Sequence, residues 1–241
     1  MKLKNYIAGQ WVEGSGEGQM LYDASTGAEV AIASTEGIDL GTAFDFARKV
    51  GNPKLRKMAF RERGMMLKNL AFYLMERKEK YYDVSYKTGA TRVDSWIDIE
   101  GGIGNLFANA SLRRKFPDLP YTTEGDPIGL SKGGTFVGHH ILVPKEGVAI
   151  HINAFNCPIW GMLEKCAVNW LAGMPAIVKP ATLTSFLTEA MVHDIIASGI
   201  LPEGALQLIC GNARDILNHV NSQDVVTFTG SASTGRMLKS H

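Results

Sequence analysis

Short apolar runs alternate with amphipathic stretches through the second half of the chain, and this alternation is the strongest constraint on its fold. The β-rich runs are residues 147–152, 176–179, 206–209 and 225–229, and helical patterns occupy residues 160–171, 185–198, 215–220 and the segment after Ser231. Strands that alternate with crossover helices form parallel sheets with right-handed connections. We therefore predict an α/β fold with a Rossmann-type parallel sheet and flanking helices.

The first half of the chain combines helical patterns with β-rich segments. Its β-rich parts are a hairpin at residues 5–13 that turns at Ala8 and Gly9, and a strand at residues 135–143. Residues 115–134 are rich in Pro, Gly and Asp without periodicity, which predicts a long irregular connection.

Three helices are expected in the same half. The first is residues 40–50 with Asp39 as its N-cap, the second is residues 61–81, and the third is residues 95–112, interrupted at Gly101 and Gly102. In the second helix, Arg63 lies away from the apolar stripe. We therefore expect Arg63 on a solvated helix face.

Composition excludes several classes of protein. A net charge of +1 argues against a nucleic-acid binder, which would need clustered excess Lys and Arg. Three cysteines without framework spacing predict reduced thiols, and the six histidines show no metal-ligand spacing, so no metal is expected. The N-terminus has no apolar signal segment and no run reaches a membrane span, so we expect a cytoplasmic protein without a membrane partner.

Ligands of open α/β sheets bind where strands hand over to loops, and three such loops carry polar candidates. Gly230 and Ser231 can form a turn and helix cap that attract a phosphate, although a plain capped helix explains them too and GSASTG is not GxGxxG. Lys179 can reach a ribose hydroxyl or phosphate, or extend to water. Asn156 can satisfy its own loop or donate to an oxyanion. Cys157 shares that loop, and we favour a structural role for it over a nucleophilic one.

Together these blocks resemble the aldehyde dehydrogenase family. AFNCP at residues 154–158 stands where that family has a Pro-Trp-Asn-Phe-Pro loop, and IVKPA and FTGSASTG match two further family blocks at fitting spacing. The resemblance implies that Asn156 donates its amide to the oxyanion of the reaction. It also implies cofactor-binding roles for a set of residues: Ile152, Phe155, Lys179, Gly230 and Ser231.

A closer resemblance covers residues 88–104 and the blocks HINAFN, WGMLEK, LICG and SQDVVTFTGSASTG. These are similar to the dehydrogenase part of the bifunctional ring-opening enzymes of aerobic phenylacetate degradation. That resemblance implies oxidation of a CoA-thioester semialdehyde to the acid, with a fused hydratase-like domain that generates the aldehyde. A related semialdehyde dehydrogenase of the benzoyl-CoA pathway is the alternative.

The position three residues after Lys179 departs from many NAD-preferring members of the family. Those members carry a glutamate that holds both ribose hydroxyls, whereas this chain has Thr182. A carboxylate would repel a 2′-phosphate, while a threonine hydroxyl can donate to it and Lys179 can pair with it. We therefore expect NADP as cofactor, with NAD as the alternative.

The family places its general-base glutamate and nucleophilic cysteine downstream of the FTGS block, and this chain ends at His241, ten residues after Ser231. We expect residues 1–241 to form the cofactor-binding part of such an enzyme, without the catalytic domain and inactive alone. The resemblance also implies a homo-oligomer formed through strands in residues 1–20 and 120–147. Three alternatives stay open: a non-catalytic dinucleotide-binding module, a CoA-acylating dehydrogenase, and a hydrolase that uses Cys157.

Overall fold

A six-stranded sheet of order β10-β7-β8-β9-β1-β2 forms the centre of the computed structural model, which describes residues 1–212 and 215–241. The strands are β1 (Lys4–Ile7), β2 (Gln10–Glu13), β7 (Ala149–Ile152), β8 (Ala176–Lys179), β9 (Leu206–Leu208) and β10 (Val225–Phe228). β10, β7, β8 and β9 are parallel, as predicted, whereas β1 is antiparallel to both β9 and β2. The sheet is therefore mixed, and the N-terminal hairpin extends it within its own chain.

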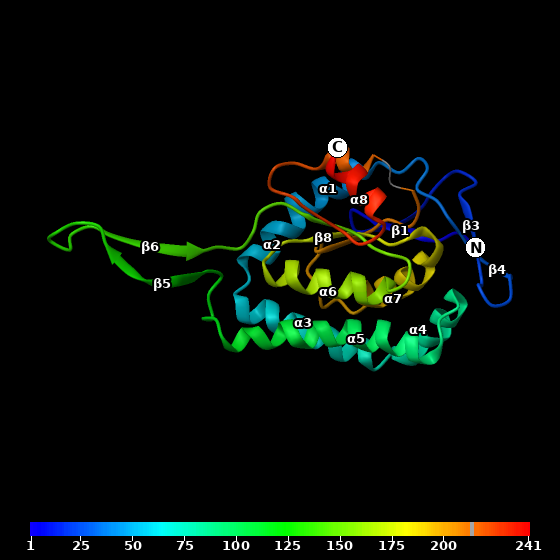
Figure 1. Ribbon diagram of the computed structural model, residues 1–241, viewed down its shortest axis with the longest axis horizontal. Coiled ribbons are helices and arrows are strands. Elements are labelled where there is room, and N and C mark those ends of the chain that lie inside the picture. The colour runs from blue at the N-terminus through cyan, green and yellow to red at the C-terminus, as the bar shows by residue number, and fades with distance from the viewer. Residues whose placement is uncertain (213–214) are drawn as a thin grey trace.

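Helices cover both faces of this sheet (Figure 1). One face carries α6 (Pro158–Leu171) and α7 (Ser185–Ala197), with α3 (Phe60–Met75), α4 (Lys78–Ser85) and α5 (Arg92–Ser111) in a further layer. The other face carries α1 (Leu40–Phe46), α2 (Asn52–Lys57) and α8 (Ala232–Lys239). Successive side chains of a strand point to opposite faces of the sheet, so each strand contributes to both layers. Val178 packs into the α6 side of the core, and Ile150 and Ile177 pack into the α1 side.

The first helix begins as predicted and runs further than predicted. The Asp39 side chain accepts a hydrogen bond from Gly41 N at 2.8 Å and caps α1. A π-helical turn (Ala47–Gly51) then joins α1 to α2, so helical structure extends to Lys57. Near the other end of the chain, the predicted helix at residues 215–220 is only a 3-10 turn, η5 (Ile216–His219).

The expectation of a solvated Arg63 is wrong. The predicted helix at residues 61–81 ends at Met75 and restarts as α4, and Arg63 on α3 is only 2% exposed. Its guanidinium donates to Leu171 O at 2.8 Å, to Leu55 O at 3.2 Å and to Met58 O. These carbonyls lie at the C-terminal ends of α6 and α2, where a helix leaves its last oxygens unpaired. Their position could not be read from the α3 sequence.

The expected interruption of α5 at Gly101 and Gly102 is also wrong, because α5 is continuous through both residues. These glycines instead allow close contact with α6. A Cβ atom on Gly101 would lie 2.2 Å from the Trp160 ring, and one on Gly102 would lie 3.0 Å from Trp160 Cα.

Residues 115–134 are not a wholly irregular connection. They contain β5 (Thr122–Gly129), which pairs antiparallel with β6 (Val137–Leu142) to form a hairpin arm that projects away from the helices and sheet (Figure 1). A second two-stranded sheet pairs β3 (Gln19–Tyr22) with β4 (Glu29–Ala33). The β5 strand is exposed along nearly all of its length, so it lacks the alternation of buried and exposed residues by which strands are recognised.

Candidate functional site

The three predicted site loops begin side by side at the C-terminal edge of the sheet. Ile152 aligns with Lys179 on one side and with Phe228 on the other. The backbone continues this pairing into the loops, where Asn153 N donates to Lys179 O and Thr229 N donates to Ile152 O, each at 3.0 Å. The predicted ligand-binding edge is therefore a continuous surface of adjacent strand ends.

Ile152 and Lys179 share a cavity of about 350 Å³ on the α8 face of the sheet. Its other walls come from η5 and α8, including Ile216, Thr234 and Met237. The Lys179 ammonium donates to Pro180 O at 3.0 Å and to Thr182 Oγ1 at 3.5 Å, and burial lowers its pKa. A partly buried cation with these two neutral oxygen partners is suited to binding a ribose hydroxyl or a phosphate oxygen.

Thr182 lines a neighbouring cavity of about 420 Å³, and Asn212 lines both cavities. The Thr182 hydroxyl is within reach of Lys179, as the NADP prediction requires. However, the carboxylates of Glu36 and Asp215 line the same cavity. The negative charge of these carboxylates would repel a 2′-phosphate, whereas the positive charge of Lys179 would attract it.

The turn at Gly230 packs closely against the ring of Phe228. A Cβ atom on Gly230 would lie 2.5 Å from Phe228 Cζ, so a larger residue would displace the ring or the turn. Ser231 then caps α8, since its hydroxyl accepts from Thr234 N at 3.2 Å. Neither Gly230 nor Ser231 lines either cavity, but Thr234 in the first turn of α8 lines the Lys179 cavity. The beginning of α8 therefore adjoins the Lys179 cavity.

Asn156 and Phe155 do not line these cavities. Both side chains are exposed, and among residues 1–212 and 215–241 none is hydrogen-bonded to the Asn156 carboxamide. The amide is thus free to meet a substrate oxygen. Cys157 beside it is half-buried, and burial together with the negative charge of Asp98 raises the pKa of its thiol. A raised pKa is the opposite of what a nucleophilic thiolate needs.

Lys165 also lies at the candidate site, where the sequence does not predict it. From α6 its ammonium donates to Asn153 Oδ1 at 2.7 Å and to Thr229 Oγ1 at 2.8 Å. It therefore joins the first loop to the third. The available signal was a lysine within a mostly apolar helix that follows the site loop.

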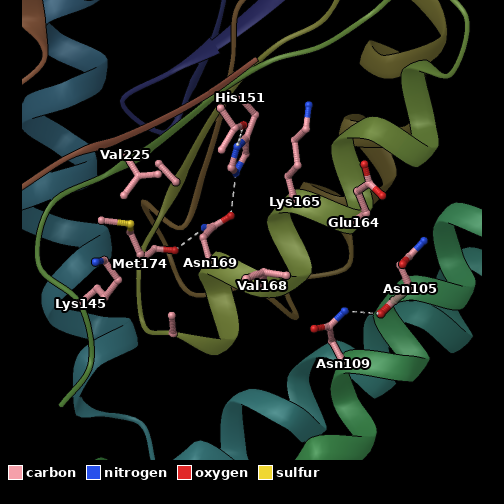
Figure 2. A pocket seen from close by; sticks show the side chains of 13 residues that line it. Asn105, Asn109, Lys145, His151, Glu164, Lys165, Val168, Asn169, Met174 and Val225 are labelled. Carbon is pink, nitrogen blue, oxygen red and sulfur yellow. Dashed lines mark hydrogen bonds between the residues drawn. The ribbon is translucent and has the colours of Figure 1, made fainter. Parts of the chain in front are cut away.

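A separate cavity of about 460 Å³ lies on the α6 face of the sheet, between α5, α6 and β10 (Figure 2). His151 lines it and is 2% exposed, with Nε2 bonded to Asn169 Oδ1 at 2.7 Å and Nδ1 bonded to Thr227 Oγ1 at 2.8 Å. Burial lowers the pKa of His151 to about 4, so the ring is neutral near pH 7. None of the residues predicted for the site lines this cavity.

The described residues show neither a metal cluster nor a membrane-spanning helix. They contain no cluster of three or more His, Cys, Asp or Glu side chains that could hold a metal ion. No helix in residues 1–212 and 215–241 combines the length and apolar character of a membrane span.

Comparison with known proteins adds the family context. A model of the aldehyde dehydrogenase family matches residues 11–241. The 3,4-dehydroadipyl-CoA semialdehyde dehydrogenase of Aromatoleum evansii is 43% identical over 242 residues, covering 100% of this chain and 47% of that protein. The alpha-ketoglutarate semialdehyde dehydrogenase of Haloferax volcanii is 26% identical over 245 residues, covering 98% of this chain and 48% of that protein.

Solved structures show the same fold. An NADP-dependent glyceraldehyde-3-phosphate dehydrogenase from Bacillus halodurans C-125 superposes with a TM-score of 0.84 at 22% identity, over 100% of this chain and 50% of that one. An NAD-dependent benzaldehyde dehydrogenase from Corynebacterium glutamicum gives 0.82 at 21%, over 99% and 51%. The chain spans about half the length of the relatives it matches. The family model covers nearly the whole chain, and the chain belongs to the aldehyde dehydrogenase family.

Proposed function

We propose that this chain is the cofactor-binding half of an enzyme that oxidises a CoA-linked semialdehyde to the carboxylic acid. The observation that carries the proposal is the meeting of Lys179, Thr182 and the Ser231-capped start of α8 at one sheet edge, where Asn156 lies in the loop after the adjacent strand β7. The substrate class is supported by the relative at 43% identity, which is named for a CoA semialdehyde. By full-length enzyme we mean a protein that carries this chain together with the second half present in its relatives.

The residues of this chain fit a nicotinamide dinucleotide, which when bound would accept a hydride from the substrate. Lys179 and Thr182 would bind the adenosine ribose, and Gly230 and Ser231 would hold the pyrophosphate at the positive end of α8. Asn156 would donate its amide to the oxygen that becomes negative when a nucleophile attacks the aldehyde. We assign the nucleophile and the general base to the second half of the full-length enzyme.

The substrate is tested by comparing kcat/KM of the full-length enzyme for a CoA-linked semialdehyde and for the same semialdehyde without CoA. We expect a preference for the CoA thioester and NADPH formation that needs no free CoA. Turnover that depends on free CoA would instead identify a CoA-acylating dehydrogenase. We assign the reaction to phenylacetate catabolism. A kcat/KM that is higher for the semialdehyde of the benzoyl-CoA pathway than for that of the phenylacetate pathway would assign the enzyme to the benzoyl-CoA pathway instead.

The cofactor is proposed to be NADP, and Thr182→Glu tests this choice. The new carboxylate would repel the 2′-phosphate, so the ratio of NADP to NAD affinity should fall by about tenfold, or ~1.4 kcal/mol. The measurement is a fluorescence titration with NADPH and NADH. Leu183→Glu is the matched control, because its side chain is 51% exposed and does not line the Thr182 cavity. An unchanged ratio for Thr182→Glu would remove the basis for the NADP assignment.

The enzyme is proposed to be a homo-oligomer that associates through the β5–β6 arm. The arm exposes apolar side chains that a monomer would leave in water: Ile128, Leu130, Phe136, Val137, Ile141 and Leu142. The N-terminal hairpin contributes less free edge than expected, because β1 is paired on both sides. Sedimentation of the full-length enzyme should show a dimer or larger species, and a monomer at micromolar concentration would contradict the proposal.

A further inference from the structure

Asp98 on α5 holds the first turn of α6 from outside that helix. Its carboxylate accepts from Ile159 N at 3.1 Å and from Trp160 N at 2.7 Å. The N-cap position of α6 is Cys157, whose side chain makes no capping bond, and Pro158 has no N–H to satisfy. Asp98 therefore performs, from 61 residues earlier in the chain, the role that an N-cap side chain usually performs.

Close packing of the two helices brings this carboxylate into place. Gly101 and Gly102 follow Asp98 on α5 and lie against Trp160, so close that a Cβ atom on Gly102 would be 3.0 Å from Trp160 Cα. Asp98 itself is only 5% exposed. The carboxylate is thus fixed between two helices rather than resting on a mobile surface.

This arrangement has an energetic cost. Burial raises the pKa of Asp98 to about 6, although the two backbone N–H groups act in the opposite direction. The folded state therefore loses stability relative to the unfolded chain as the pH rises from about 3.8 through about 6, and the loss is complete at neutral pH. An asparagine would fill the same space without a buried charge.

The residue next to this anchored turn is Asn156. Its loop is attached at the start through Asn153, which bonds Lys179 O and the Lys165 ammonium. Beside Asn156, the Thr184 hydroxyl makes a longer contact to Phe155 O at 3.4 Å. On the α6 side, Cys157 O accepts the first α6 hydrogen bond from Gly161 N at 2.9 Å. On its C-terminal side, the backbone of Asn156 therefore leads directly into the turn that Asp98 fixes.

We propose that Asp98 is a positioning residue for Asn156: its carboxylate fixes the first turn of α6 and thereby aims the Asn156 amide at the reacting oxygen. This proposal rests on the proposed role of Asn156 as oxyanion donor. It concerns the charge on Asp98, because the charged acceptor binds both N–H groups more strongly than a neutral amide oxygen would.

The first test is Asp98→Asn in the full-length enzyme. We expect kcat to fall at least tenfold, with the NADPH dissociation constant within twofold of the parent and a melting temperature that is unchanged or higher. Glu100→Gln is the matched control. The Glu100 carboxylate is on the same helix as Asp98 but accepts from Lys78 and Tyr82 and makes no bond to α6, so its loss should leave kcat unchanged. A fall in kcat accompanied by weaker NADPH binding and a lower melting temperature would indicate a general structural role and overturn the proposal.

The second test reads the loop directly and needs no turnover. Cys166 and Cys210 are wholly buried, so Cys157 is the accessible thiol among the described residues of this chain. Because the second half of the full-length enzyme is assigned a nucleophilic cysteine of its own, iodoacetamide alkylation is followed by mass spectrometry of the Cys157 peptide, and Cys157→Ser should abolish that signal. Asp98 also raises the pKa of the Cys157 thiol, as do Glu164 and Asp94, so rates must be compared at the high-pH limit, where the thiol is fully ionised. We expect Asp98→Asn to raise that limiting rate at least threefold.

An unchanged limiting rate together with an unchanged kcat would overturn the proposal. The two measurements also distinguish failure of this proposal from failure of the proposed oxyanion role of Asn156. If Asn156→Ala leaves kcat intact, the oxyanion role of Asn156 is wrong. A faster limiting alkylation in Asp98→Asn would then still show that Asp98 positions the loop, and an unchanged rate would show that it does not.

Discussion

Replacing Asn156 by alanine should lower kcat of the full-length enzyme by about 10²–10³-fold, which is the typical effect of removing one oxyanion donor. The expected size follows from the position of the side chain. Its carboxamide is exposed and has no bond to any residue in the described part of the chain, so its loss should not disturb the fold. Single-turnover rates of NADPH formation give the effect on the chemical step.

Two companion variants sharpen this measurement. Asn156→Asp keeps the size of the side chain but replaces the donor with a negative acceptor, and it should lose at least as much activity as alanine. Asn218→Ala removes an exposed amide from η5, away from the loop of Asn156, and should leave kcat unchanged. A loss below threefold in Asn156→Ala, or a matching loss of NADPH affinity, would contradict the assigned role.

Replacing Arg63 by methionine should reduce the free energy of unfolding by about 3 kcal/mol or more, because buried carbonyls that lose a charged donor carry a desolvation penalty. Methionine keeps much of the volume of the arginine stem but leaves the carbonyls of Leu55, Met58 and Leu171 without that donor. These carbonyls belong to chain segments before and after α3, so Arg63 connects elements that are distant in sequence. Denaturant unfolding followed by tryptophan fluorescence gives the size of the loss.

The matched control is Arg61→Met on the same helix, because Arg61 is exposed. Its effect should stay within about 0.5 kcal/mol, as expected for a surface position. Equal midpoints for the two variants would mean that the Arg63 hydrogen bonds are replaced without loss.

Features with local causes could be predicted from the sequence. The bounds of β8 agree with the apolar run at residues 176–179, and Asp39 caps its helix through a neighbour two residues away. Ser231 likewise caps α8, as its place after Gly230 predicts. Each of these depends on a few adjacent residues, which is the range that propensity and capping rules describe.

Features that depend on distant segments could not be predicted in this way. The environments of Arg63, Lys165 and Asp98 are set by backbone and side chains that lie elsewhere in the chain. Gly101 and Gly102 look like helix breakers until the Trp160 ring is placed against them. The sequence thus predicts which loops form the candidate site. It does not predict the side chains that hold those loops, because their contacts are made with distant segments.

The position of β1 between β9 and β2 has a consequence for biosynthesis. Tyr6 pairs with Leu208, and Ala8 N donates to Gln207 Oε1, so the second partner of β1 lies about 200 residues later in the chain. At ribosomal rates of about 5–20 residues per second, β9 emerges roughly 10–40 s after β1. During this interval the hairpin with Trp11 and Val12 has no sheet to join. Closure of such a distant contact is slow, and nascent chains halted before β9 should be bound by chaperones at their N-terminal strand.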